Sequence, residues 1–213
     1  MAFSVRGARP EDADFIAWAI LTSQRGHLLR GWFDIALNRS ELECLAFVRR
    51  LTKTRIHSLW HTSNFLIADT EGVPVAALCA LPAAGALSTS RSAIEEVASG
   101  IGLDVAERTA IWQRGAYVGK CWMVGDEHAC LIEHVATVPS HRRRGLARAL
   151  LESAFTVGRE HGCKTAQITF YIGNEAAERS YSKAGFQFAE EKRHSDFEAM
   201  TGASGFRRFV RNI

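Results

Sequence analysis

The feature that most constrains this chain is an apolar strand that leads directly into a helix opened by arginines and a glycine. The stretch CLIEHVATV, within 129–138, is largely apolar and predicts a central strand. After the turn Pro139-Ser140-His141, an amphipathic helix is expected over 145–161, with Gly162 suited to the position just past its end. The fold class then depends on which other strands and helices the sequence predicts.

Strand and helix patterns alternate along the rest of the chain. Pro10 and the acids after it predict the start of a helix, and apolar spacing predicts another over 41–53. The stretches 64–69 and 74–81 predict an antiparallel hairpin, because only the short turn 70–73 connects them. Further strands are expected at 3–7, 164–170, 186–188 and 206–210, and a further helix at 174–183. The sum is an α+β domain around one mixed sheet.

One segment interrupts the series of strands. Between 88 and 114, Ile94, Val97 and Ile101 follow helical spacing, and Gly100 and Gly102 break the pattern. We therefore expect one or two helices inserted at about 85–125, between the hairpin and the central strand.

Composition limits the class of protein. With 213 residues, 47% of them hydrophobic, and no long linker, the chain is expected to form one domain over 1–213. No segment reaches the length of a membrane span and the N-terminus lacks the apolar centre of a signal peptide, so we expect a cytoplasmic protein without a membrane partner. Five cysteines without a CxxC pair argue against a disulfide framework or a thiolate zinc site: Cys44, Cys79, Cys121, Cys130 and Cys163.

The arginines at 142–144 and 148 have the wrong sign for a helix start, where the macrodipole favours acids. Cations gathered there make sense if an anion lies in front of the helix. Gly145 and the small Ala147 allow the backbone to approach that anion closely. The stretch is neither a P-loop nor a GxGxxG motif, so a diphosphate ligand other than a nucleoside triphosphate or a dinucleotide is favoured.

Three stretches together resemble a known family. RRRGLA, 142–147, resembles the (Q/R)xxGx(G/A) coenzyme A pyrophosphate loop of the GNAT superfamily of N-acetyltransferases. NEAAERSYSKAGF, 174–186, is similar to that family's N-x-x-A-x-x-x-Y-x-x-x-G-F segment, and the opening VRGARPEDADFIAWAI is similar to its first strand and helix. The resemblance covers almost the whole chain except about 85–125.

The resemblance implies a GNAT-like fold, a central mixed sheet flanked by helices, and acetyl-CoA as co-substrate without a metal. It implies that the backbone of Val135 and Thr137 holds the pantetheine arm and that an amide near Val135 stabilises the oxyanion. It also implies that Tyr181 is the acid for the departing thiolate. The residues expected to bind the rest of the cofactor are Arg142, Arg143, Arg144, Gly145, Leu146, Ala147, Arg148 and Asn174, of which Asn174 is also a natural helix N-cap.

The acceptor amine also needs a base. Glu133 is the carboxylate within reach on the central strand, and we expect it to act through a water molecule; its alternative role is an ordinary salt bridge. His134 is the second candidate, and strand periodicity predicts that it points to the opposite face from Glu133. His57 and His61 have metal-ligand spacing for a helix but lack a third ligand, so no metal site is expected.

Two functions are consistent with these residues. The first is an N-acetyltransferase that passes the acetyl group of acetyl-CoA to a primary amine of a small molecule or protein, by direct attack in a ternary complex. The alternative is a module that binds acyl-CoA or nucleic acid without turnover, although the modest net charge of +3 makes a nucleic-acid partner unlikely as the main ligand. The insertion carries Trp112, Tyr117 and Trp122 and is expected to cover the acceptor pocket as a lid, together with Trp32 and Phe33. The alternative is that these aromatic residues are buried against the domain or against a second subunit of a homodimer.

Overall fold

The computed structural model describes residues 3–213, so Met1 and Ala2 lie outside the described part. Seven strands form one sheet in the order β1-β2-β3-β4-β5-β7-β6, in which β4 and β5 are parallel and the other neighbouring strands are antiparallel. This mixed sheet confirms the α+β prediction. The strands are β1 (Ser4–Gly7), β2 (Phe65–Thr70), β3 (Val73–Pro82), β4 (Cys130–Thr137), β5 (Thr165–Tyr171), β6 (Gln187–Arg193) and β7 (Gly205–Asn212).

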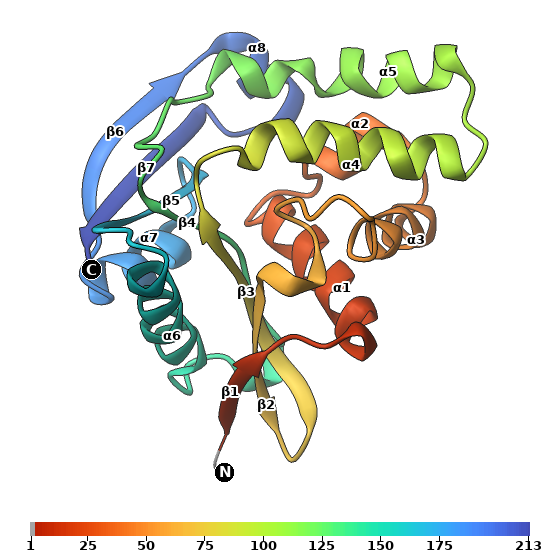
Figure 1. Cartoon of the computed structure of the whole chain (residues 1–213). Helices are drawn as coiled ribbons and strands as arrows, with labels where there is room; N and C mark the ends of the chain where they lie inside the picture. The colour runs from red at the N-terminus through yellow and green to blue at the C-terminus, as the bar shows by residue number, and fades with distance from the viewer. Residues whose placement is uncertain (1–2) are drawn as a thin grey trace.

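Helices cover both faces of the sheet. Figure 1 shows α6 and α7 on one side, α1 and α3 on the other, and α4 and α5 across one end of the molecule. The helices are α1 (Ala13–Arg25), α2 (Trp32–Leu37), α3 (Glu41–Leu51), α4 (Ala86–Gly100), α5 (Val105–Gly115), α6 (Leu146–Glu160), α7 (Glu175–Lys183) and α8 (Ser195–Thr201), with short 3₁₀ turns η1 (Pro10–Asp12), η2 (Thr62–Asn64), η3 (Ala116–Lys120) and η4 (Pro139–His141). The sequence did not predict α2 or α8, each of seven residues or fewer.

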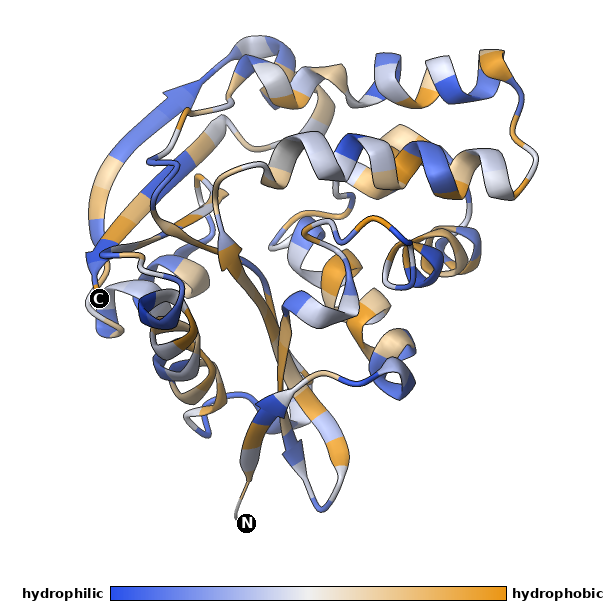
Figure 2. Ribbon diagram, in the orientation of Figure 1, coloured by the Kyte–Doolittle hydropathy of each residue, from blue (hydrophilic) through white to orange (hydrophobic). Residues whose placement is uncertain are grey.

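Two hydrophobic cores lie on opposite faces of the sheet, and the central strands between them are mostly hydrophobic in Figure 2. We call them the α1-side core and the α6-side core. The α1-side core includes Ile16, Ile20, Phe47, Val48, Ile67, Ala77, Cys79 and Ala136. The α6-side core includes Leu78, Ile132, Leu150, Leu151, Phe155, Ile168, Phe170 and Tyr181. Because each core lies on one face of the sheet, the core to which a strand residue belongs shows the face to which its side chain points.

The expected insertion consists of α4, α5 and η3, between β3 and β4. Gly100 ends α4 and Gly102, with a φ of 79°, lies in the connection, so the segment forms two helices. Helix α5 packs closely on α2 where Gly115 meets the Trp32 ring. A Cβ atom at Gly115 would come within 2.7 Å of that ring. The Trp32 indole also donates a hydrogen bond to the Gly115 carbonyl over 3.1 Å.

The aromatic side chains of this region are mostly buried in packing contacts. Phe33 is fully buried and its ring lies 5.3 Å from Trp60. Trp112 packs against Trp32 and donates to Glu95, and Tyr117 packs against Phe197 of α8. Phe33 and Tyr117 are therefore buried against the domain and Trp32 and Trp112 are partly buried, whereas Trp122 is 41% exposed.

In the part of the chain that the structure describes, no helix combines the length and the apolar character that crossing a membrane requires.

Candidate active site

The two parallel strands at the centre of the sheet separate partway along their length. Their pairing runs from Cys130 and Ala166 to Ile132 and Ile168, while β4 continues to Thr137 and β5 to Tyr171. Beyond Ile132, the edge of β4 that faces β5 therefore presents backbone N–H and C=O groups to a gap rather than to a neighbouring strand. An extended chain can bind such an edge as an added strand. Val135 and Thr137, expected to hold the pantetheine arm, lie on this open stretch.

A β-bulge deforms β4 at the start of the gap. Ala77 of β3 pairs with Ala136, and Cys79 pairs with Glu133. On β3 one residue, Leu78, lies between these two pairs, whereas on β4 two residues do, His134 and Val135. The backbone of His134 has a φ of 54°, in the left-handed region. An extra residue with an unusual backbone is the mark of a bulge.

The bulge changes which side chains share a face. Ile132 belongs to the α6-side core, whereas Ala136, four residues later, belongs to the α1-side core. Glu133 pairs with Cys79, an α1-side residue, and His134 contacts Ser23 of α1. Glu133 and His134 therefore lie on the same face. The expectation that they point to opposite faces was wrong, because strict alternation does not hold across a bulge.

Glu133 is partly buried where the strands separate. Burial raises the pKa of its carboxyl group to about 8, so near neutral pH it exchanges its proton readily. A carboxyl group of this kind is suited to proton transfer, because its pKa lies near the working pH.

Tyr181 lies on α7 and belongs to the α6-side core. Its ring packs 5.4 Å from Phe170 and 6.2 Å from Phe186, and the residue is 8% exposed. Burial raises the pKa of its hydroxyl group above the ordinary value, and the nearby charge of Glu133 raises it further. The tyrosine is thus held protonated, and it lies near enough to Glu133 for that charge to act on it, although Glu133 faces the α1 side of the sheet and Tyr181 packs on the α6 side.

His134 lies deeper than Glu133. It is 4% exposed, its Nδ1 atom is 3.2 Å from the Ser23 hydroxyl, and its ring is stacked parallel to Phe65 of β2. Burial lowers the pKa of the imidazole to about 3, so the ring is neutral and a weak base. This makes His134 a poorer base than Glu133.

The loop before α6 has the backbone of an anion site. Arg143 and Gly145 both have positive φ, of 63° and 80°, and a Cβ atom on Gly145 would meet nothing within 4 Å. The first turn of α6 contains no acidic side chain. The first N–H groups of a helix have no partners within it, so this loop presents donors to open space. The backbone and charge here fit a pyrophosphate group.

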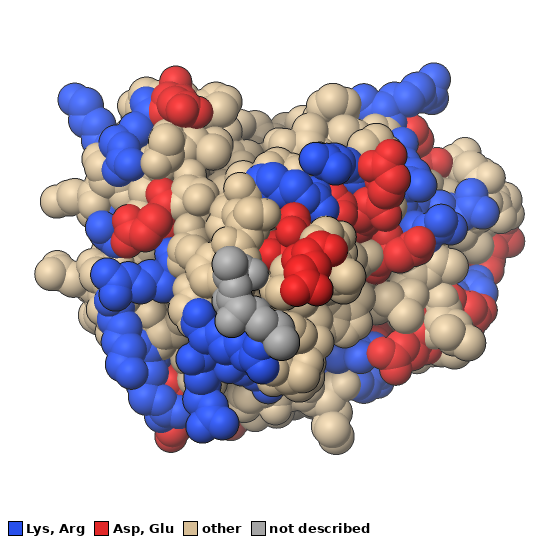
Figure 3. Space-filling view, turned by 90° about the horizontal axis from the view of Figure 1, so that it is seen from below, with Lys and Arg blue, Asp and Glu red and all other residues tan. Residues whose placement is uncertain are grey.

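The side chains of this loop add positive charge. Arg142, Arg143, Arg144 and Arg148 are exposed, and Leu146 is buried beneath them in the α6-side core. Arg142 reaches back to donate a hydrogen bond to the Thr137 carbonyl over 3.4 Å. Figure 3 views the molecule from below in the frame of Figure 1; Lys and Arg side chains form a patch at its lower left and also occur elsewhere on this face, where Asp and Glu side chains lie among them.

Asn174 acts as the N-cap of α7, where its side chain accepts a hydrogen bond from the Ala177 backbone over 3.2 Å. A Cβ atom on Gly26 would come within 3.1 Å of the Asn174 amide, so the connection between α1 and α2 lies close by. This cap fixes the start of the helix that carries Tyr181.

The two histidines with metal-ligand spacing do not lie on a helix. His57 and His61 are in the connection between α3 and η2, and their rings stack with centroids 3.7 Å apart. The lone pairs of two stacked rings lie in two nearly parallel planes and do not converge on one shared metal ion. Among residues 3–213, no group of three or more potential metal-ligating side chains was found.

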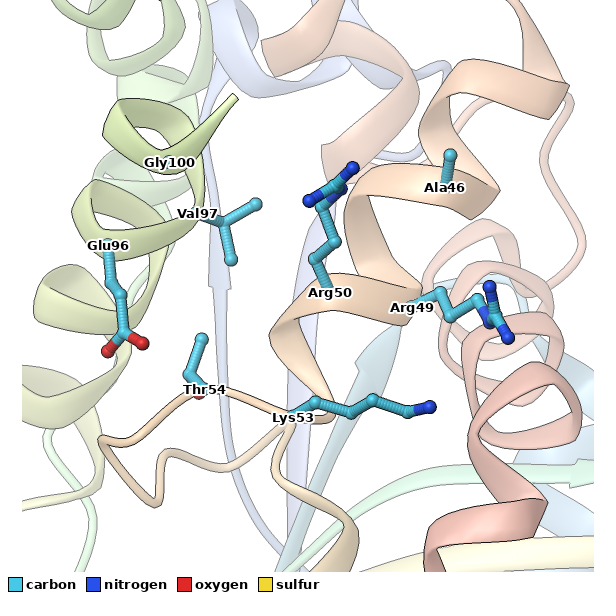
Figure 4. Close-up of a pocket in the computed structure, with 8 residues that line it drawn as sticks. All are labelled: Ala46, Arg49, Arg50, Lys53, Thr54, Glu96, Val97 and Gly100. Atoms are coloured by element: carbon cyan, nitrogen blue, oxygen red, sulfur yellow. The ribbon is translucent and has the colours of Figure 1, made fainter. Parts of the chain in front are cut away.

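A cavity of about 560 Å³ opens elsewhere, between α3 and α4 (Figure 4). Its walls include Arg50 and Lys53 near the end of α3 and Glu96 and Val97 of α4. None of the predicted site residues lines it. The predicted residues lie instead at the gap between β4 and β5, which is the candidate site.

Three parts of this geometry were absent from the sequence prediction: the bulge, the separation of the strands and the role of Ser23. The adjacent polar pair Glu133-His134 within an apolar strand was a signal for the bulge, since a regular buried strand rarely holds two polar residues in succession. Ser23 gave no signal, because serine is common in helices and turns.

Comparisons with known proteins identify a family and a shared fold. Residues 34–186 match the model of the acetyltransferase (GNAT) family. One solved structure described as an acetyltransferase superposes with a TM-score of 0.72 at 16% identity, covering 99% of each chain. An N-acetyltransferase from Staphylococcus aureus Mu50 superposes with a TM-score of 0.69 at 20% identity, covering 98% of this chain and 100% of the other. A search of curated proteins found no match.

Proposed function

The chain belongs to the acetyltransferase (GNAT) family, and on that premise we propose how its own residues transfer the acetyl group of acetyl-CoA to a primary amine. Acetyl-CoA supplies the activated thioester carbonyl, and the protein supplies binding, orientation and proton transfer. The reaction is a direct attack within a ternary complex, with the acceptor a small molecule or a protein amine.

Two parts of the fold would hold the cofactor. The N–H groups from Arg143 to Arg148 would bind the pyrophosphate, with the arginine side chains adding charge. The open edge of β4 at Val135 and Thr137 would bind the pantetheine arm in the manner of an added strand. An amide near Val135 would donate to the thioester oxygen as negative charge develops on it. Asn174 would contribute by fixing the start of α7.

Glu133 would remove the proton from the attacking amine, through one water molecule. Its carboxylate form is the active one, and a pKa near 8 leaves part of the population in that form at neutral pH. Tyr181 would donate its phenolic proton to the thiolate that leaves. Because burial and the charge of Glu133 raise the pKa of Tyr181, the hydroxyl keeps its proton until the thiolate forms.

One observation carries this proposal: the edge of β4 is unpaired beyond Ile132 and leads to the glycine loop before α6. Glu133 stands at the start of this unpaired stretch, near enough to Tyr181 for its charge to raise the pKa of the tyrosine. A base, an acid and a cofactor-binding edge in one place are what amine acetylation requires.

The decisive test compares Tyr181→Phe and Glu133→Gln with the parent enzyme, using thiol release from acetyl-CoA with a panel of primary amines. We expect amine-dependent release by the parent protein and loss of most of it in both variants. Binding of acetyl-CoA should persist in both variants, because neither side chain belongs to the proposed cofactor loop. Parent activity retained by both variants would remove these two residues from the mechanism.

A further inference from the structure

We propose that Ser23 of α1 and His134 of β4 form an anchor that fixes the β-bulge, making both of them positioning residues for the acetyl transfer. The structural part of this proposal is independent of the assigned reaction. Its kinetic part rests on the function proposed above.

The direction of the hydrogen bond follows from counting protons. The Ser23 Oγ atom lies 2.9 Å from the Ile20 carbonyl oxygen and 3.2 Å from His134 Nδ1. Because the carbonyl can only accept, both hydrogen bonds form together only when Ser23 donates to Ile20 and accepts from a protonated Nδ1. In this arrangement Nε2 is a bare lone pair, whereas the opposite tautomer would bury an N–H donor that has no partner among the described residues.

The surroundings of His134 support a fixed, neutral ring. Nε2 is buried and has no hydrogen-bond partner among the described residues. The ring packs parallel to Phe65, with 6.1 Å between centroids. A charged imidazole here would be costly, because it would lose its hydration without gaining a counter-charge. Leaving Nε2 unpartnered also has a cost.

The backbone conformation explains the choice of residue. A positive φ outside glycine is most often found in Asn, Asp and His, and bulky apolar residues are strained there. Of these three, histidine combines a side-chain donor with a flat ring that stacks on Phe65. His134 thus adopts the positive φ that the bulge requires, and its side chain contacts Ser23 of α1.

The anchor matters because the bulge decides which residues face the reaction. Relaxation of β4 to strict alternation would turn either Glu133 or the stretch that begins at Val135 to the other face. The bond from His134 to Ser23 ties this irregular peptide to α1, which packs against β4 throughout the α1-side core. Loss of the bond would loosen both the base and the cofactor-binding edge.

The first test reads the proton on His134 directly by ¹⁵N nuclear magnetic resonance. We expect a neutral ring with the proton on Nδ1 at about pH 6, where an ordinary histidine is largely protonated. A charged ring at that pH, or a proton on Nε2, would overturn the anchor. This measurement requires neither an acceptor nor turnover.

The second test uses Ser23→Ala with Ser90→Ala as a matched control. Ser90 is a buried helical serine whose hydroxyl donates to the Ala86 carbonyl, and no histidine contacts it. We expect Ser23→Ala to speed hydrogen exchange of the β4 amides around Glu133 and Val135, and Ser90→Ala to leave them unchanged. Ser23→Thr, which keeps the hydroxyl, should restore protection.

Kinetics separate positioning from simple stability. Ser23→Ala should lower kcat by roughly tenfold to a hundredfold, as expected when a reacting group is misplaced, while acetyl-CoA affinity falls less. Equal kcat and equal β4 exchange in Ser23→Ala and the parent would contradict the proposal. If the parent protein shows no turnover with any amine, the proposed function fails, and the resonance and exchange results still decide whether the anchor exists.

Discussion

At the scale of single residues, Glu133 links folding to pH. Burial raises its pKa from the ordinary 4.5 to about 8, so between these values the folded protein holds a proton that the unfolded chain releases. The stability that this proton contributes is fully present below about pH 4.5 and is lost as the pH rises through about 8. We expect the stability of Glu133→Gln relative to the parent to increase from about pH 5 to about pH 9, measured by urea unfolding. Parallel pH dependences for the two proteins would show that the carboxyl group is not buried as described.

The same group should shape the rate profile. The parent kcat/KM for an alkyl amine is expected to rise with pH through about 8, as Glu133 ionises. In Glu133→Gln only the free amine can react, so the rise should move to the pKa of the amine itself. The rate deficit should be about a hundredfold near pH 8 and should shrink above the amine's pKa. A pH profile unchanged by the substitution, with His134→Gln altering it instead, would make His134 the base.

Tyr181→Phe removes one hydroxyl from a packed aromatic cluster. We expect kcat to fall by roughly tenfold to a thousandfold, because an unassisted thiolate leaves less readily, and acetyl-CoA affinity to stay nearly constant. Stopped-flow kinetics would confirm that the chemical step limits the rate. An unchanged kcat under that condition would exclude Tyr181 as the acid.

At the scale of elements, the loop before α6 and the insertion each depend on one glycine. Gly145→Glu places a negative side chain in front of the N–H groups that are proposed to hold the pyrophosphate. We expect it to abolish the rise in melting temperature that acetyl-CoA gives the parent protein. Gly102→Glu is the matched control, because Gly102 has nearly the same φ and open surroundings but lies far from the loop, between α4 and α5. A full acetyl-CoA shift in Gly145→Glu would remove this loop from the cofactor site.

The insertion is held by the contact of Gly115 with Trp32. Gly115→Ala forces a methyl group to within 2.7 Å of the indole, so α5 must move away from α2. We expect a loss of about 1–3 kcal/mol in the free energy of unfolding. Gly119→Ala, where a Cβ atom meets nothing within 4 Å, should have little effect in the same urea titration. Equal stability of the two variants would show that α5 does not pack on α2 in this way.

At the scale of the whole molecule, local patterns predicted most of the fold. Apolar spacing and turn residues located all seven strands and six of the helices, because long periodic segments and glycines act through local conformation. The pattern failed for α2 and α8, which are too short to show a period. It also misplaced His134, because no residue-by-residue rule reveals that two positions of β4 face one position of β3.

The site was predictable to the extent that its chemistry lies in short motifs. Gly145 and Tyr181 were identified because their neighbours form recognisable segments. The separation of β4 from β5, the burial that raises the pKa of Glu133 and the contact with Ser23 depend on residues distant in sequence. The acceptor likewise stays outside the prediction, since fold and cofactor loop do not determine it.

Whether the protein acetylates amines is decided by thiol release from acetyl-CoA across a panel of primary amines, with mass spectrometry of the products. We expect amine-dependent release of coenzyme A, one acetyl group added to the amine, and loss of both in Tyr181→Phe and Glu133→Gln. Acetyl-CoA binding without transfer to any amine, small or peptidic, would contradict this expectation and favour a module that binds acyl-CoA without turnover.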